Sequence, residues 1–168
     1  LNDRSEKRNS IIGRTYLEAK FLRYFTFTTN IGIELNNYRS QYFQNRVVGD
    51  GVTGGGTSSR TSNEYRQISL NQLLNYDRSF GRHDISVLVA HESQENRDEY
   101  FSGSRRAMNL DGNIELANFV TLSGVDGELR ELKREGYFSY IKYGYDNKYF
   151  VDLSYRRDAS SRFSPQSR

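Results

Sequence analysis

Few residues in this 168-residue chain have the types and spacing needed for covalent or metal chemistry. The chain has two histidines and no cysteine, which removes disulfides, thiolate zinc sites and thiol catalysis. His83 is followed by Asp84, but neighbouring residues of a strand point to opposite faces, so the two do not form a catalytic pair. His91 falls within a row of apolar residues. We therefore expect no enzyme activity, no metal ion and no cofactor.

Two loop-like segments carry weak ligand-binding patterns. The Gly-rich stretch 49–56 lacks the Lys-Ser/Thr ending of a phosphate-binding loop, and no helix pattern follows it. Residues 109–113, Asn-Leu-Asp-Gly-Asn, share some features with a calcium loop, but the spaced acidic ligands and the closing Glu are absent. Both segments are therefore predicted to be loops without a bound ion or nucleotide.

Polar side chains that recur at every second residue offer a different, non-covalent chemistry. Rows of hydroxyl, amide and charged groups could line a path for a polar solute, although each group could also simply contact water. The candidates for this lining are Tyr16, Glu18, Lys20, Thr28, Asn30, Asn71, Asn75, Asp152 and Arg156.

Segment 24–37 shows most clearly which kind of element positions these rows. Its apolar residues alternate with polar or small ones, and the apolar row contains Phe25, Phe27, Ile31, Ile33 and Leu35. Side chains alternate across a strand, so the pattern predicts one long strand with an apolar face and a polar face. The run is longer than the usual soluble strand of about 5–6 residues and fits a membrane-spanning strand, which needs roughly 9–11.

The same alternation predicts about six strands in all. They cover residues 14–21, 24–37, 67–80, 84–92, 137–145 and 149–158. Tight turns are predicted at 22–23, 81–82 and 146–148, and long loops at 38–63 and 97–135. An outer-membrane barrel has this arrangement, with short periplasmic turns and long extracellular loops.

The composition is also that of a barrel wall. Hydrophobic residues make up only 35% of the chain, yet aromatic residues reach 14%, and barrels combine a polar lumen with aromatic girdles. The rings expected near the tight turns are Phe21, Phe25, Tyr76, Phe80, Tyr145 and Tyr149. The predicted fold class is all-β, an antiparallel transmembrane barrel segment. Since eight strands is the smallest bacterial barrel, six belong to a larger one.

Two soluble alternatives start from the same residues. An aromatic cluster at one end of a soluble sandwich would also place rings near turns, and an exposed sheet can stack nucleic-acid bases. The net charge of +3 is small, however, and Tyr143 shares a face with Ile141 while Lys142 opposes them. We therefore expect no nucleic-acid partner, and a soluble all-β carbohydrate- or nucleic-acid-binding module remains the less favoured alternative.

Two stretches resemble a known family. The first begins with Lys148-Tyr149-Phe150 and continues through residues 154–158 (Ser-Tyr-Arg-Arg-Asp) into 159–163 (Ala-Ser-Ser-Arg-Phe). It is similar to the corresponding stretch of SusC/RagA TonB-dependent outer-membrane transporters. The second stretch is similar to the same family. It is a hairpin that comprises residues 74–80 and the His-led strand from His83 to Glu92. Ala159 and Ala90 stand where that family usually has Gly, which affects turn geometry rather than the resemblance itself.

The resemblance implies a barrel of about 22 strands around an N-terminal plug, in the outer membrane of a Gram-negative bacterium. It implies TonB-driven import of oligosaccharides or peptides, with a SusD-like lipoprotein as partner and outer-membrane lipid around the wall. The chain, residues 1–168, would be an internal piece of that barrel, with the plug and TonB box elsewhere in the protein. A passive porin or another outer-membrane receptor is the alternative to an importer.

Overall fold

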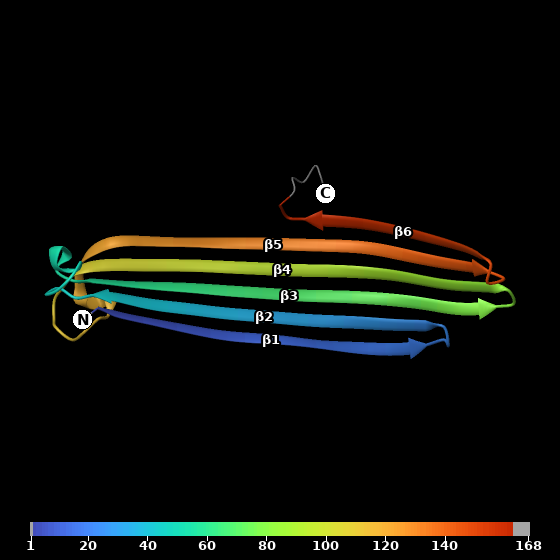
Figure 1. Cartoon of the computed structure of the whole chain (residues 1–168), viewed down its shortest axis with the longest axis horizontal. Helices are drawn as coiled ribbons and strands as arrows, with labels where there is room; N and C mark the ends of the chain where they lie inside the picture. Colours follow the sequence, from blue (N-terminus) through green and yellow to red (C-terminus); the bar gives the residue numbers. More distant parts are fainter. Residues whose placement is uncertain (1, 163–168) are drawn as a thin grey trace. The chain divides into compact units, whose positions relative to one another are not determined.

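Six strands form one sheet in the computed structural model, which describes residues 2–162. The sheet order follows the chain from β1 to β6 (Figure 1), as expected of antiparallel hairpins. The strands are β1 Asp3–Phe21, β2 Phe25–Gln44, β3 Thr57–Phe80, β4 His83–Met108, β5 Phe119–Tyr145 and β6 Tyr149–Ser160. Two short 3-10 turns, η1 Val52–Gly54 and η2 Leu116–Asn118, lie in the connections. The predicted all-β class and the six strands are confirmed.

The predicted loop bounds at 38–63 and 97–135 are wrong, because strands occupy most of both ranges. β2 runs on to Gln44 and β3 begins at Thr57, while β4 extends to Met108 and β5 begins at Phe119. In these extensions both faces of the sheet carry polar residues, so the hydrophobic alternation that marks a strand disappears. The backbone pairing does not depend on that alternation and continues.

Contacts divide the chain into two compact units, which we treat separately. The turn unit contains residues 12–34, 67–96 and 131 onward, and therefore holds the three tight turns. The loop unit contains residues up to 11, 35–66 and 97–130, and therefore holds the two longer connections.

Left-handed backbone conformations close the three tight turns of the turn unit, at the predicted positions. Gly81 has φ 61°, which suits the first central position of a type II′ hairpin turn. Asp146 and Asn147 both have positive φ, and the Lys148 amide donates to the Tyr145 carbonyl at 3.0 Å, as in a type I′ turn. Leu22, with φ 48°, adopts the same region without the help of a Gly or Asn side chain.

The two faces of the turn unit differ as predicted. In the β5–β6 register, Ile141 pairs with Leu153 and Tyr143 with Val151 on one face. The next pair, Lys142 with Asp152, points to the other face, since side chains alternate along each strand. We call these the apolar face and the polar face.

Aromatic rings gather on the apolar face close to the tight turns. Phe21 stacks on Phe25 with ring centroids 5.5 Å apart, and Phe25 lies 4.9 Å from Tyr76. Near the other turns, the His83 ring lies 5.2 Å from Phe80 and 5.0 Å from Tyr145. Such ring contacts stabilise by about 0.5–1.5 kcal/mol each beyond the area they bury. These ring contacts thus involve side chains from five different strands.

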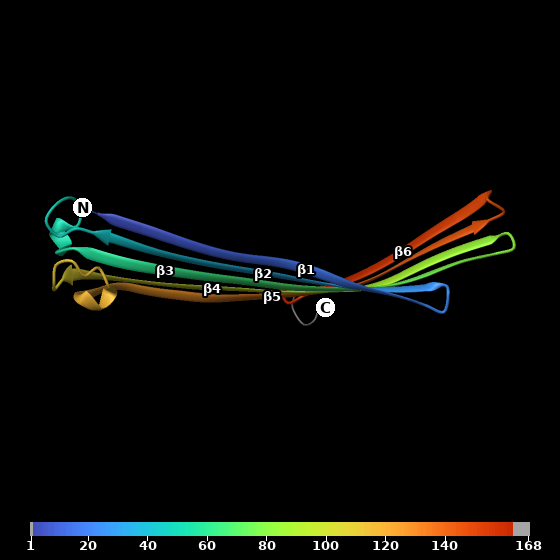
Figure 2. The same ribbon diagram turned by 90° about the horizontal axis from the view of Figure 1, so that it is seen from below.

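The two connections of the loop unit are ordered by hydrogen bonds and lie beside one another (Figure 2). The Ala107 and Met108 amides donate to the carbonyls of Gly56 and Gly55, respectively, which joins the first connection to the end of β4. Asn118 organises the second connection: its side-chain amide donates to the carbonyls of Leu110 and Asn113.

Little of the described chain is buried. Phe43 and Phe119 pack edge to face with centroids 6.3 Å apart, and both are buried in the loop unit. In the turn unit, by contrast, Ile31, Ile33 and Leu153 remain exposed. Among residues 2–162, no helix is long and apolar enough to cross a membrane. A sheet with an exposed apolar face needs a covering that the chain itself does not supply.

Candidate functional site

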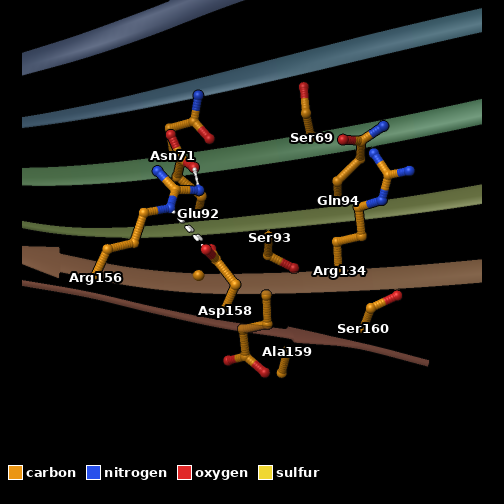
Figure 3. A pocket seen from close by; sticks show the side chains of 12 residues that line it. Ser69, Asn71, Glu92, Ser93, Gln94, Arg134, Arg156, Asp158, Ala159 and Ser160 are labelled. Atoms are coloured by element: carbon orange, nitrogen blue, oxygen red, sulfur yellow. Dashed lines mark hydrogen bonds and ion pairs between the residues drawn. The ribbon is translucent and has the colours of Figure 1, made fainter. Parts of the chain in front are cut away.

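A hollow on the polar face of the turn unit is the candidate site, and we call it the Arg156 hollow (Figure 3). Its volume is about 470 Å³, which falls in the range of sites for small ligands. Strands β3 to β6 all contribute to its lining. The lining residues are Ser69, Asn71, Glu92, Ser93, Gln94, Arg134, Glu135, Gly136, Arg156, Asp158, Ala159 and Ser160.

Two carboxylates fix the guanidinium of Arg156 (Figure 3). Its Nε donates to both carboxylate oxygens of Asp158, at 3.0 and 2.9 Å, on the same strand. Its Nη2 reaches Glu92 on β4 at 3.1 Å, so the side chain extends across β5. The guanidinium plane also lies over the Phe138 ring, 5.7 Å from its centroid. Arg156 is therefore held at several points, as a binding group must be to present a constant geometry.

Gly136 leaves room for this arrangement. A Cβ added there would lie 2.8 Å from the Asp158 carboxylate and 3.4 Å from Arg156 Nη2. The register places Gly136 directly opposite Asp158 on the neighbouring strand. A residue without a side chain thus lets the charged pair lie flat against the sheet.

Arg134 gives the hollow a second cation. It lines the hollow near Gln94 and Ser160 (Figure 3), and the contacts found among residues 2–162 include no ion pair for it. Together with Arg156, Glu92 and Asp158, it makes the hollow rich in charge of both signs. This arrangement can bind polar solutes through hydrogen bonds and ion pairs.

A second hollow on the same face, the Tyr16 hollow, has a volume of about 340 Å³. It adjoins the first, because Ser69 and Asn71 line both. Gly32 plays the same role here as Gly136, since a Cβ on it would meet the Ser69 hydroxyl at 2.5 Å. The other residues of this lining are Arg14, Thr15, Tyr16, Asn30 and Ile31.

Four of the nine predicted lining residues meet in these two hollows: Tyr16, Asn30, Asn71 and Arg156. The others lie elsewhere. Lys20 is 3.4 Å from Glu18, both largely exposed, and Asp152 accepts a hydrogen bond from Tyr140 at 2.9 Å. Thr28 and Asn75 line neither hollow. Whether any of the nine contacts a cargo stays a prediction.

Sequence reasoning omitted the partners of Arg156. Glu92 and Asp158, the two carboxylates that bind Arg156, both occupy polar rows, so the alternation contained the signal that would have included them. The alternation gives no information on the cross-strand register, and it is this register that brings Glu92 of β4 close to Arg156 of β6. The clustering becomes visible only when the strands are aligned.

A smaller hollow of about 270 Å³ lies in the loop unit, lined by Asn63, Asp98, Tyr100, Glu128 and Arg130. Arg130 donates to both oxygens of Glu128, at 2.7 and 2.6 Å, and this hydrogen-bonded cation lowers the pKa of the Glu128 carboxyl. No group of His, Cys, Asp or Glu among residues 2–162 is arranged to hold a metal ion.

An all-β sheet with an apolar face, a ring cluster near its tight turns and a charged polar face defines a class of protein, the segment of a transmembrane β-barrel. The comparisons narrow this class. The chain is 27% identical over 164 residues to TonB-dependent receptor P3 of Formosa agariphila, and 25% identical over 169 residues to TonB-dependent receptor P39 of the same organism. No family model matches it.

The fold is that of a solved transporter. The structure of the RagAB peptide transporter matches 98% of this chain with a TM-score of 0.83 at 22% identity. The RagAB peptide importer in its open-open state matches 96% with a TM-score of 0.78. The chain spans 16% of the length of the two receptors and 19% of the RagAB chain. The resemblance to TonB-dependent transporters, seen first in the motifs, is confirmed over nearly the whole chain.

Proposed function

We propose that this chain is part of the wall of an outer-membrane importer in a Gram-negative bacterium. The observation that carries the proposal is the pair of unlike faces on one sheet. The apolar face, with its ring cluster, would meet lipid, and the polar face with the Arg156 and Tyr16 hollows would line the lumen. The tight turns would lie on the periplasmic side and the two longer connections outside the cell.

The cargo would be an oligosaccharide or a peptide. A lumen wall with amide, hydroxyl and paired charged groups suits either, since both offer many hydrogen-bonding groups. The description of RagAB as a peptide transporter supports the peptide, and charges of both signs around Arg156 would match the charged termini and side chains of peptides. Lumen contacts of this kind need no covalent step.

The energy would come from the inner-membrane TonB complex, acting through a plug carried by other parts of the protein. The naming of both sequence relatives as TonB-dependent receptors supports this part of the proposal. A SusD-like lipoprotein would cover the extracellular mouth. Its contact area would include the ends of the two connections, where Val47, Val48 and Leu110 are exposed.

Cell fractionation and uptake test this function in the full-length protein. We expect recovery in the outer-membrane fraction, and uptake of fluorescent peptide or oligosaccharide that stops when the gene is deleted or the proton-motive force is collapsed. Uptake that survives collapse would identify a passive porin instead. Recovery of the full-length protein in the soluble fraction would end the membrane proposal.

A further inference from the structure

A third hollow lies in the loop unit, and we call it the Arg60 hollow. Its volume is about 620 Å³, larger than that of either hollow on the polar face. Strands β1 to β4 line it, together with the start of η2. The lining residues are Ser5, Glu6, Lys7, Arg39, Ser40, Gln41, Arg60, Thr61, Ser62, Phe101 and Leu116.

Several side chains of the Arg60 hollow share strand rows with exposed apolar residues of the same loop unit, such as Leu35. On β2, Arg39 and Gln41 follow Leu35 at two-residue steps, so they continue its row. Cross-strand contacts agree with this assignment: Arg60 of β3 donates to Gln41 at 3.2 Å, and both residues line the hollow. Arg39 lies four residues beyond Leu35, about 13 Å along the strand at roughly 3.3 Å per residue. That is where a bilayer's headgroups follow its hydrocarbon.

The Arg60 hollow contains cations that its carboxylates do not fully neutralise. Each nearby carboxylate already has a cation: Glu115 pairs with Arg60, and Glu6 pairs with Arg4. Glu64 approaches Arg39 only at 3.9 Å, and the Arg39 side chain is 69% exposed.

Two further groups have no partner among the contacts found within residues 2–162. The Nε atom of Arg60 is buried and donates to nothing, and the ammonium of Lys7 makes no ion pair. An anion of one or two charges would complete the arrangement.

One side of the same hollow is apolar. Phe101, half exposed on β4, and Leu116 of η2 form this side. A cationic pocket with an aromatic wall at the edge of an apolar band matches an amphiphile, whose charged headgroup and apolar part meet at this level. A soluble sugar or peptide would not need the apolar wall.

We propose that the Arg60 hollow binds the phosphate-bearing headgroup of a lipid in the outer leaflet. This inference rests on the membrane location given under Proposed function. Lys7 and Arg39 would donate to the phosphate, while Phe101 and Leu116 would contact the apolar part of the lipid. The lipid would then hold the outer surface of the wall without entering the lumen.

Native mass spectrometry of the purified full-length protein tests the site, with diphosphoryl lipid A as the probe. The test variant is the double substitution Lys7→Gln, Arg39→Gln. Its matched control is Arg8→Gln, Arg23→Gln, which removes two cations that line none of the hollows. We expect the test variant to bind lipid A about tenfold more weakly, since each cation near an anionic lipid contributes about 1 kcal/mol before screening. The control variant should bind like the wild type.

A second comparison needs no variant: the wild type should bind dephosphorylated lipid A as weakly as the test variant binds the phosphorylated form. Equal binding of both lipids, or unchanged binding by the test variant, overturns the lipid site while leaving import untouched. Complete displacement of lipid A by millimolar inorganic phosphate would instead identify a site for free phosphate, and would also overturn it. Uptake and fractionation, measured on the same variants, report separately on the proposed function.

Discussion

Arg156 shows how a single exposed side chain on a sheet can be held in one position. Residues of β4, β5 and β6 contact its guanidinium. These contacts restrict the long side chain, as packing in a hydrophobic core would in a soluble protein. Because Arg156, Glu92 and Asp158 are all about half exposed, solvent screens these ion pairs and they contribute little to stability. Their value is therefore in positioning rather than in folding.

Gly136→Val tests this role. The new side chain displaces Asp158 and Arg156 from the sheet, and we expect cargo binding to weaken roughly tenfold, as losing one hydrogen bond to a charged group costs about 1.5 kcal/mol. Uptake of labelled cargo by cells measures this. The matched control is Gly124→Val on the same strand, where a Cβ meets nothing within 4 Å. Equal uptake by the two variants would show that the Arg156 hollow takes no part in transport.

At the scale of elements, alternation predicted each strand only where one face is apolar. The alternation predicts segment 24–37 as a strand because Ile31 and Ile33 alternate with Asn30 and Gly32, whereas 38–44 has polar residues on both faces, which favours a loop. The tight turns were placed correctly because Gly81 and the Asp146-Asn147 pair have a conformational signature of their own. Cross-strand partners such as Glu92 and Arg156 were beyond prediction, since register is a property of strand pairs.

Ile31→Arg and Asn30→Arg, adjacent substitutions on β2, test the assignment of faces. An arginine facing the middle of the bilayer costs about 2–4 kcal/mol, whereas one facing the lumen remains in water. We therefore expect Ile31→Arg to lower the fraction of folded barrel and Asn30→Arg to leave it unchanged. Heat-modifiable mobility on electrophoresis measures that fraction. The reverse order would mean that the two faces have been exchanged.

Gly81→Val tests the β3–β4 turn. A β-branched residue with φ near 61° is strained by about 1–2 kcal/mol, so this variant should need less urea to unfold. Gly13→Val is the control, because Gly13 has an ordinary φ and open space around its Cα. If both variants unfold at the same urea concentration, the turn conformation is not the one described.

For the whole molecule, the exposed apolar face and the unclosed sheet make the chain dependent on its surroundings. An open sheet in lipid leaves backbone groups unpaired at its edges, at a cost of several kcal/mol per group. The two edge strands, β1 and β6, therefore require neighbours from the rest of the barrel. Length alone suggests one domain, whereas the composition, the alternation and the family resemblance indicate a part of a larger barrel.

Residues 1–168 expressed alone should consequently fail to form a cooperative soluble fold. We expect the isolated chain to collect in inclusion bodies and to show no cooperative thermal transition in detergent-free buffer, measured by circular dichroism. The full-length protein, refolded in detergent, is the positive control. A monomeric, cooperatively melting chain in plain buffer would favour the soluble all-β module.

The length of the paired strands also limits how much of the chain a protease can cleave. β3, β4 and β5 have 24, 26 and 27 residues, far more than the roughly 9–11 that cross a bilayer, and their surplus stays paired. Proteases cleave unpaired, flexible stretches that fit into their active-site clefts. In this chain such stretches are mainly residues 45–56 and 109–118. Both are tied down by internal hydrogen bonds, so under the proposed function the wall would present secreted proteases with few sites to cleave.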